Sequence, residues 1–173
     1  MIQRIQTVFL LFALVFTGLT FIAPVWYFEA DGTVERIQGF QHVLQSEPST
    51  VMVESIEKTQ LFFQHPESLR MIVHSASVVL GIISLVLIVM TILAYSDRKR
   101  QMRLAQFVII LTMIQILGFV FLSLQAPVYL NAGAVNRADY GFALPVLTII
   151  MAWLAHKNIK KDDDLVRSVD RIR

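Results

Sequence analysis

Residues that could do chemistry are few in this chain, and they are scattered. The sequence has no cysteine, which excludes disulfides, thiolate metal sites and thiol nucleophiles. Its histidines could in principle combine with carboxylates in a metal site, but no H-x-x-x-H or H-E-x-x-H spacing supports one. The residues concerned are His42, His65, His74, His156, Glu29, Asp31, Glu54 and Glu57. We therefore predict no metal and no other cofactor.

Sequence motifs of the common enzyme classes do not stand out either. There is no Gly-rich phosphate loop and no G-x-S-x-G, and an intramembrane protease, phosphatase or acyltransferase would need a catalytic cluster. Paths for ions or protons usually need carboxylates or bases within the membrane. No Asp, Glu, Lys or Arg lies deep in an apolar segment of this chain. These observations argue against an enzyme, a pump and a coupled transporter.

Four apolar segments must position every other side chain. The 173 residues are 55% apolar and 16% charged, whereas soluble domains have about 25% charged residues. Residues 71–96 and 104–136 carry no formal charge, and an apolar run of about 18 residues can cross the membrane as a helix. We predict an all-α membrane protein, one domain with four transmembrane helices at about residues 7–23, 69–95, 102–124 and 140–159.

The first apolar segment has a second interpretation, a cleaved signal peptide. Its uncharged part is longer than the usual apolar region of about 7–15 residues, and cleavage after Ala23 would place Pro24 next. We favour an uncleaved helix whose outer end is marked by Trp26 and Tyr27, because aromatic rings prefer the membrane interface.

The basic residues predict the orientation of the helices. Loops on the cytoplasmic side carry an excess of Lys and Arg. The predicted inner segments hold eleven of these residues and the outer segments four, so we place both termini, and the tail of residues 160–173, in the cytoplasm. The inner residues are Arg4, Arg98, Lys99, Arg100, Arg103, Lys157, Lys160, Lys161, Arg167, Arg171 and Arg173; the outer are Arg36, Lys58, Arg70 and Arg137. Since membrane orientation explains the basic clusters, the pI near 9.1 does not indicate nucleic-acid binding.

The first outer loop, residues 29–68, is the sizeable non-membrane segment. Asp31-Gly32 is a hairpin-turn signal between the β-prone runs 25–28 and 34–37. Residues 49–53 are a third β-prone run, and residues 55–65 favour a helical turn or two. We therefore predict a small ordered cap with two or three strands outside the membrane.

Small and polar residues recur along the predicted helices at alternating spacings of three and four. Such seams let helix backbones approach closely, and the 3.5-residue repeat predicts a left-handed bundle. They are His74, Ser77, Gly81, Ser84, Ile88 and Thr91; Gln6, Leu10, Ala13, Thr17, Thr20 and Pro24; Gly141, Pro145, Thr148, Ala152 and Ala155; and, more weakly, Ala105, Thr112 and Gln115. We interpret His74, Ser77, Gly81, Ser84, Thr112 and Gln115 as intramembrane polar packing. A polar path through the bundle is the alternative.

Two charged segments could bind partners. The link between the second and third helices holds Arg98, Lys99, Arg100 and Arg103, which would attract anionic lipid at about 1 kcal/mol per basic residue. In the tail, Leu165, Val169 and Ile172 share a helical face flanked by Arg167 and Arg171, and the preceding Asp run suits a helix start. We predict a short helix that binds a partner or docks on the bundle's inner mouth; a solvated tail is the alternative.

Several stretches together resemble one family. They are residues 1–7, 98–104, 140–145, 159–162 and above all the tail residues 165–173. The chain resembles an uncharacterised four-helix integral-membrane family of Bacteroidetes-type bacteria, domain of unknown function 4293. The resemblance implies a multi-pass protein of the inner (cytoplasmic) membrane and implies no reaction.

The function expected from these features is that of a small interaction or scaffold protein. Its partners would be membrane lipids and another membrane or cytoplasmic protein, and a homo-oligomer is compatible with the pattern. The alternative is a lipid- or small-molecule-binding bundle or an accessory transporter subunit. A deep cavity lined by His74, Thr112 and Gln115 would favour that alternative, and tight packing would favour the scaffold.

Overall fold

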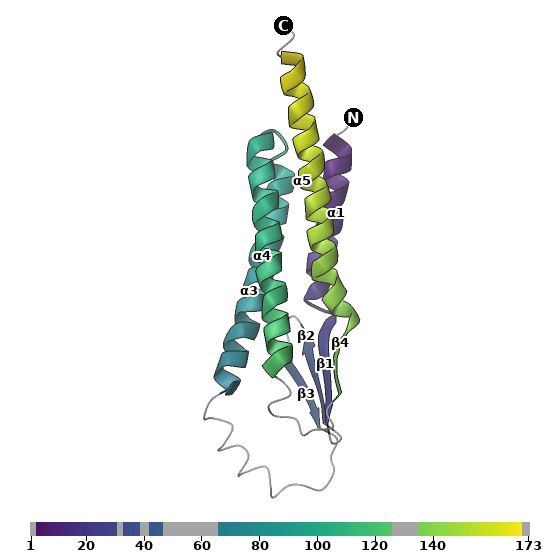
Figure 1. Cartoon of the computed structure of the whole chain (residues 1–173), viewed down its shortest axis with the longest axis vertical. Helices are drawn as coiled ribbons and strands as arrows, with labels where there is room; N and C mark the ends of the chain where they lie inside the picture. Colours follow the sequence, from purple (N-terminus) through teal and green to yellow (C-terminus); the bar gives the residue numbers. More distant parts are fainter. Residues whose placement is uncertain (1–2, 31–32, 39–41, 47–65, 126–134, 171–173) are drawn as a thin grey trace, which may run out of the picture.

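The computed structural model describes residues 3–30, 33–38, 42–46, 66–125 and 135–170. These residues form the helices α1 (Gln3–Thr20), α3 (Pro66–Leu93), α4 (Arg98–Gln125) and α5 (Ala143–Asp170), the short 3-10 helix η2 (Tyr140–Phe142), and the strands β1 (Pro24–Ala30), β2 (Thr33–Gln38), β3 (His42–Ser46) and β4 (Val135–Ala138). The helices lie side by side, with the sheet at one end and both chain termini at the other (Figure 1). We call the end away from the sheet the distal end.

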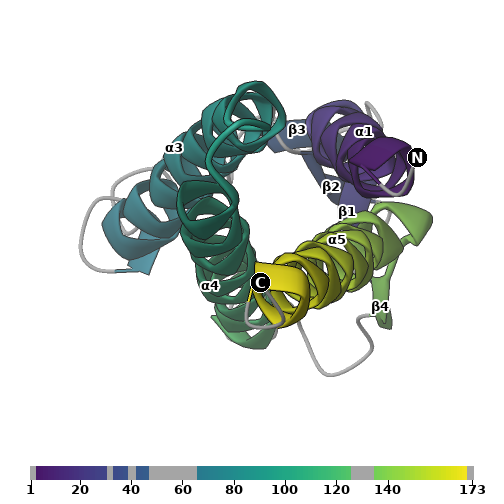
Figure 2. The same ribbon diagram turned by 90° about the horizontal axis from the view of Figure 1, so that it is seen from above.

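The four helices pack in a ring. Helix α1 contacts α5 and α3, and α4 contacts α3 and α5 (Figure 2). Each helix turns its seam of small and polar residues toward the others. The buried positions are Gln6, Leu10, Ala13, Thr17 and Thr20 on α1; Ser77, Gly81, Ser84, Ile88 and Thr91 on α3; Gln101, Ala105, Val108, Thr112, Gln115, Phe119, Leu122 and Ser123 on α4; and Pro145, Thr148, Ala152, Ala155, Ile159 and Asp162 on α5.

The outward faces of the helices are apolar, as a lipid-facing surface must be. Large side chains such as Leu117 (67% exposed) and Ile72 (62%) point away from the other helices. Residues 72–93, 98–124 and 140–168 are each long and apolar enough to cross a membrane. The apolar part of α1, residues 5–20, is shorter, at about 24 Å for a rise of about 1.5 Å per residue. The chain is therefore a membrane protein with at least three helices suited to spanning.

Helix α4 begins at Arg98, four residues before the expected start at 102. The reason is an N-cap: the Asp97 carboxylate accepts a hydrogen bond from the backbone N–H of Arg100 over 3.1 Å. Aspartate satisfies N–H groups that the first turn leaves unpaired, and its charge complements the helix dipole. The basic residues 98–103 therefore belong to a helix, and the interpretation of this segment as a link was wrong.

Helix α5 also differs from the expectation, because it does not stop at residue 159. It continues to Asp170, so Asp163 lies within the helix, where its carboxylate pairs with Arg167 four residues later at 2.8 Å. The Asp run is thus inside α5 and does not start a separate tail helix. Pro145 is the third residue of α5, where a missing N–H costs no helical hydrogen bond.

The strands form one antiparallel sheet in the order β3-β2-β1-β4. The expected pairing of the strands on either side of Asp31-Gly32 is present, since β1 pairs with β2 in a register that sets Glu29 opposite Val34. Strand β3 (residues 42–46) and strand β4 were not predicted. The predicted third strand at 49–53 and the helical turns at 55–65 lie outside the described residues.

Strand β4 belongs to the second outer loop and pairs with β1, setting Tyr27 opposite Arg137. This pairing joins the segment that follows α1 to the segment that precedes α5. Where the sheet meets the helices, Trp26 packs edge-on against Phe142 with ring centroids 5.5 Å apart. Val25, Phe119 and Leu122 form a buried cluster at the same junction. The sheet therefore rests directly on the helices.

Candidate functional site

The polar interior of α3 and α4 contains most of the predicted packing residues. The structure buries Ser77, Gly81, Ser84, Thr112 and Gln115. Gln115 Nε2 donates to the Ser77 carbonyl oxygen across the helices at 3.2 Å. The Ser77 and Thr112 hydroxyls instead donate to carbonyls one turn earlier in their own helices, at 2.8 Å each. Such bonds satisfy buried hydroxyls within a helix, so these groups serve packing.

His74 and Ser84 differ from the other residues of the predicted set. His74 is half-buried near the sheet end of α3. Ser84 is fully buried, and its Oγ has no hydrogen-bond partner within the described part of the chain.

Helices α1 and α5 are joined by polar contacts deep in the structure. The Thr17 and Thr148 hydroxyl oxygens lie 3.3 Å apart. At the distal end, Gln6 Nε2 donates to Asp162 Oδ2 at 3.0 Å, and both side chains are buried. A buried carboxyl group is costly unless it is hydrogen-bonded, so the bond from Gln6 stabilises Asp162 there.

Sequence reasoning missed Asp162, which it assigned to a tail. A signal was available, because Asp162 continues the 4-3 spacing of the α5 seam three residues beyond Ile159. Gln101 likewise extends the α4 seam four residues before Ala105, and it is buried. The buried seam positions therefore continue along α4 and α5 beyond the ends of the apolar segments.

A charged cleft of about 490 Å³ opens at the distal end between α4 and α5. Its walls are Lys99, Met102, Arg103, Gln106, His156, Lys160, Asp163, Asp164 and Arg167. A neighbouring depression of about 470 Å³ surrounds the turn between α3 and α4 and includes Arg98. The four residues predicted to contact anionic lipid are thus divided, with Lys99 and Arg103 facing the cleft.

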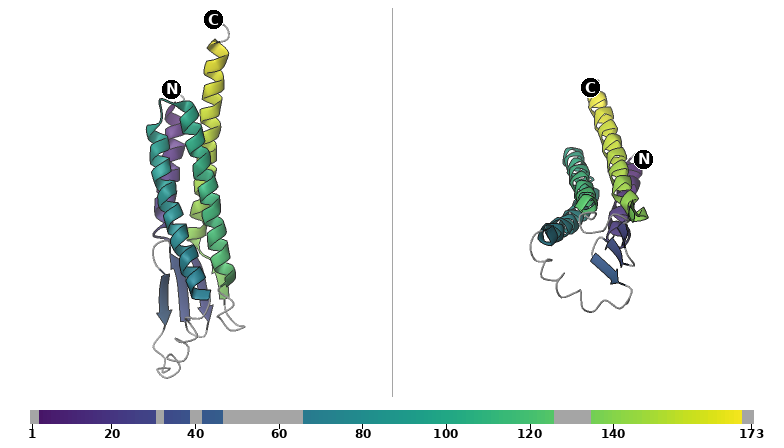
Figure 3. Two further views of the ribbon diagram at one scale, coloured as in Figure 1. Left: turned by 90° about the vertical axis from the view of Figure 1, so that its left-hand side faces the viewer. Right: turned by 60° about the horizontal axis from the view of Figure 1, so that its bottom comes forward.

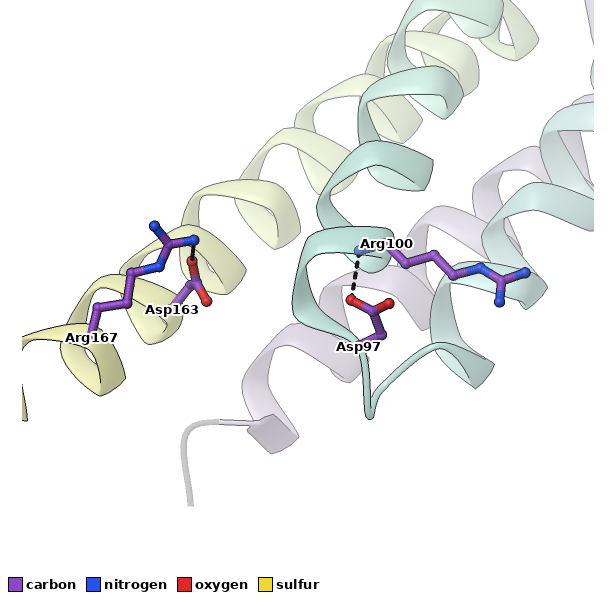
Figure 4. A network of polar contacts seen from close by, with 4 residues as sticks. All are labelled: Asp97, Arg100, Asp163 and Arg167. Atoms are coloured by element: carbon purple, nitrogen blue, oxygen red, sulfur yellow. Dashed lines mark hydrogen bonds and ion pairs between the residues drawn. The ribbon is translucent and has the colours of Figure 1, made fainter. Parts of the chain in front are cut away.

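Arg100 lies outside this arrangement. Its side chain extends away from α5, where Asp163 and Arg167 form their ion pair (Figure 4). The side chain of Arg100 is exposed and does not line either depression. Four basic residues that look equivalent in the sequence therefore have different surroundings.

The end of α5 carries the residues predicted to bind a partner. Leu165 and Val166 are 47% and 43% exposed, and Arg167 is exposed and paired with Asp163. Leu165 does not dock on the mouth of the helices, in contrast to one alternative for the tail. Val166 was not predicted. The side chain of Val169, and the residues Arg171 and Ile172, lie outside the description.

A family model described as domain of unknown function (DUF4293) matches residues 2–172, nearly the whole chain. No curated protein matches the chain. Within the described residues, no three His, Asp or Glu side chains are placed to hold a metal ion.

Proposed function

We propose that this chain, which belongs to the family of the domain of unknown function DUF4293, acts by binding. It is a small multi-pass protein of the inner (cytoplasmic) membrane that holds another membrane or cytoplasmic protein at the end of α5. It catalyses no reaction and uses no cofactor. The support for a scaffold is the close packing of the helices along their small-residue seams.

The observation that carries this proposal is the projection of α5. The helix extends beyond the other helices at the distal end (Figure 3). Helix α5 continues for eight residues beyond Asp162, which is hydrogen-bonded to α1, and eight residues are about 12 Å of helix. The exposed Leu165 and Val166 lie on this projection, past the charged residues 160–164. Apolar side chains beyond the charged boundary of a membrane helix are suited to a protein partner.

The orientation belongs to the same proposal. Eleven of the 15 Lys and Arg fall in the segments at the distal end, which supports a cytoplasmic distal end and a periplasmic sheet. Reporter fusions after residues 100 and 173 should report the cytoplasm, and fusions after residues 50 and 132 the periplasm. A periplasmic signal at residue 100 would contradict this topology.

The binding proposal is tested in intact cells with a photo-crosslinking amino acid at Ser168, which is exposed beside Leu165. A crosslinked protein product is expected from the parent chain. The double variant Leu165→Ser/Val166→Ser should lose at least ten-fold of that product while inserting normally, because the apolar contact is gone.

The matched control removes equal apolar surface from the same helix within the membrane, as Val146→Ser/Ile150→Ser. It should keep the crosslinked product, since these residues face lipid in the proposed arrangement. Equal products from the tail variant and the parent chain would show that the tail is only a solvated end.

A further inference from the structure

The cleft between α4 and α5 lies at a definite depth relative to the apolar surface. On α4 the uncharged stretch begins at Leu104, directly after Arg103. On α5 the last exposed aromatic residue is Trp153, and Lys157 Nζ lies 5.3 Å from the centre of its ring. Aromatic rings and the ends of long basic side chains gather where hydrocarbon meets the lipid head groups. The cleft walls therefore stand at head-group level.

The charges around the cleft favour an anion. Four basic residues face it, two on each helix, against the carboxylates of Asp163 and Asp164. Arg167 is paired with Asp163 at 2.8 Å. Lys99, Arg103 and Lys160 make no ion pair within the described residues, and four basic residues against two carboxylates leave the opening with a net positive charge. Converging cations of this kind bind phosphate groups well.

A buried nitrogen lies in the same wall. His156 Nδ1 is buried and has no hydrogen-bond partner among the described residues. Buried polar atoms are normally paired, and the exceptions often mark functional positions. His156 is one turn before Lys160 on α5, and its side chain adds a polar group to the same wall of the cleft.

Apolar side chains continue from the cleft toward the membrane interior. Phe107 lies one helical turn from Arg103, and it is 55% exposed. Trp153 and Ile150 are exposed on α5 on the membrane side of Lys157. An anionic head group in the cleft would thus have apolar surface beside it for its acyl chains, which a soluble anion would not use.

We propose that this cleft is a binding site for the phosphate group of an anionic phospholipid. Lys99, Arg103 and Lys160 contact the phosphate oxygens, and the chains lie against the exposed side chains of α4 and α5. The site goes beyond the protein-binding function proposed for the end of α5 and does not depend on it.

The experiment reconstitutes the full chain in phosphatidylcholine vesicles that contain increasing amounts of phosphatidylglycerol brominated on its acyl chains. Bromine quenches nearby tryptophan fluorescence, and Trp26→Phe leaves Trp153, near the cleft, as the reporter. Saturable quenching by brominated phosphatidylglycerol, in preference to brominated phosphatidylcholine, is the expected result.

Two double variants remove the same formal charge from the distal end. Arg103→Gln/Lys160→Gln removes cations from the cleft, and Arg100→Gln/Lys161→Gln removes cations that do not line it. Loss of two direct contacts to the phosphate, at about 1 kcal/mol for each contact, should weaken the preference for phosphatidylglycerol roughly thirty-fold. The second pair should change it less than three-fold. Equal losses of the preference in the two double variants would contradict the site and would show that the surface charge as a whole attracts the lipid.

Two further arms complete the test. Asp163→Asn removes the partner of Arg167 and should strengthen quenching several-fold, which keeps the proposal testable if the cleft double variant does not fold.

Inorganic phosphate at about 10 mM is ample to fill a site for soluble phosphate, and it should not displace the brominated lipid. Displacement by inorganic phosphate, or no gain from Asp163→Asn, would contradict a lipid site. Leu165→Ser/Val166→Ser should leave quenching unchanged.

Discussion

The two helix pairs of this protein, α3 with α4 and α1 with α5, are assembled in different ways. Helices α3 and α4 follow one another in the chain, joined by a short turn that Asp97 closes by capping α4. Helices α1 and α5 come from opposite ends of the chain. They are joined by the buried contacts Gln6–Asp162 and Thr17–Thr148, and by the pairing of β1 with β4.

This difference shows when a short turn is enough to place two helices side by side and when specific contacts are needed. A short connection places α3 and α4 side by side at little cost in loop entropy, so small residues and the Gln115–Ser77 hydrogen bond complete the pair. For α1 and α5 the chain gives no such help, and the partner must be specified by contacts. Buried polar groups specify one register, because any slip leaves them unpaired. The α1–α5 pair should therefore be the more sensitive to single changes.

The largest effect is expected for Gly141→Ala, where the sheet meets α5. A Cβ at this position would collide with the backbone carbonyl of Pro24, which cannot move without shifting β1. We expect a loss of about 3 kcal/mol in the free energy of unfolding, measured by denaturant titration in micelles.

Gly18→Ala is the matched control for that change, because a Cβ on Gly18 meets no atom within 4 Å. In a helix interior alanine is favoured over glycine, so this variant should gain about 0.5–1 kcal/mol. Equal losses for the two variants would remove the special role given to the junction of sheet and helix.

The next largest effect concerns Gln6→Leu, which leaves the buried Asp162 carboxylate without its donor. The free energy of unfolding should fall by about 2 kcal/mol, since an unsatisfied buried polar group costs more than the bond contributes. The double variant Gln6→Leu/Asp162→Leu should recover most of the loss. If the double variant is as unstable as the sum of its single changes, the contact does not couple α1 to α5.

A smaller effect is expected for Gly81→Ala, on the α3–α4 pair. Here a Cβ would lie 2.9 Å from both Gln115 Nε2 and Phe21 Cζ, which are the ends of side chains that can shift. The loss should be about 1–2 kcal/mol. A loss larger than that of Gly141→Ala would reverse the comparison between the two pairs.

The smallest effect is expected for Asp97→Ala, which removes the cap that starts α4. Loss of such a cap costs about 1 kcal/mol. Asp97→Asn should retain most of the stability, because the amide oxygen can accept the same hydrogen bond. A melting temperature of Asp97→Ala equal to that of the parent chain would show that the turn closes without the cap.

The sequence by itself determined the features that depend on local composition and period. Uncharged apolar runs predicted the helices, the 4-3 spacing predicted which residues are buried, and Asp31-Gly32 predicted the first hairpin. These signals are readable because each side chain is placed by the repeat of its own helix or by its own turn.

Only the tertiary structure decided which segments far apart in the chain meet. The four residues of β4 carry no alternating pattern, and they form a strand because β1 offers an edge to them. Asp162 resembled a solvated tail residue until Gln6, 156 positions away, was placed beside it. Likewise, the helical repeat places Lys99 and Arg103 on one face, but only the approach of α5 makes that face the wall of a cleft. Such features are set by the partner surface, and a local pattern contains no information about a partner.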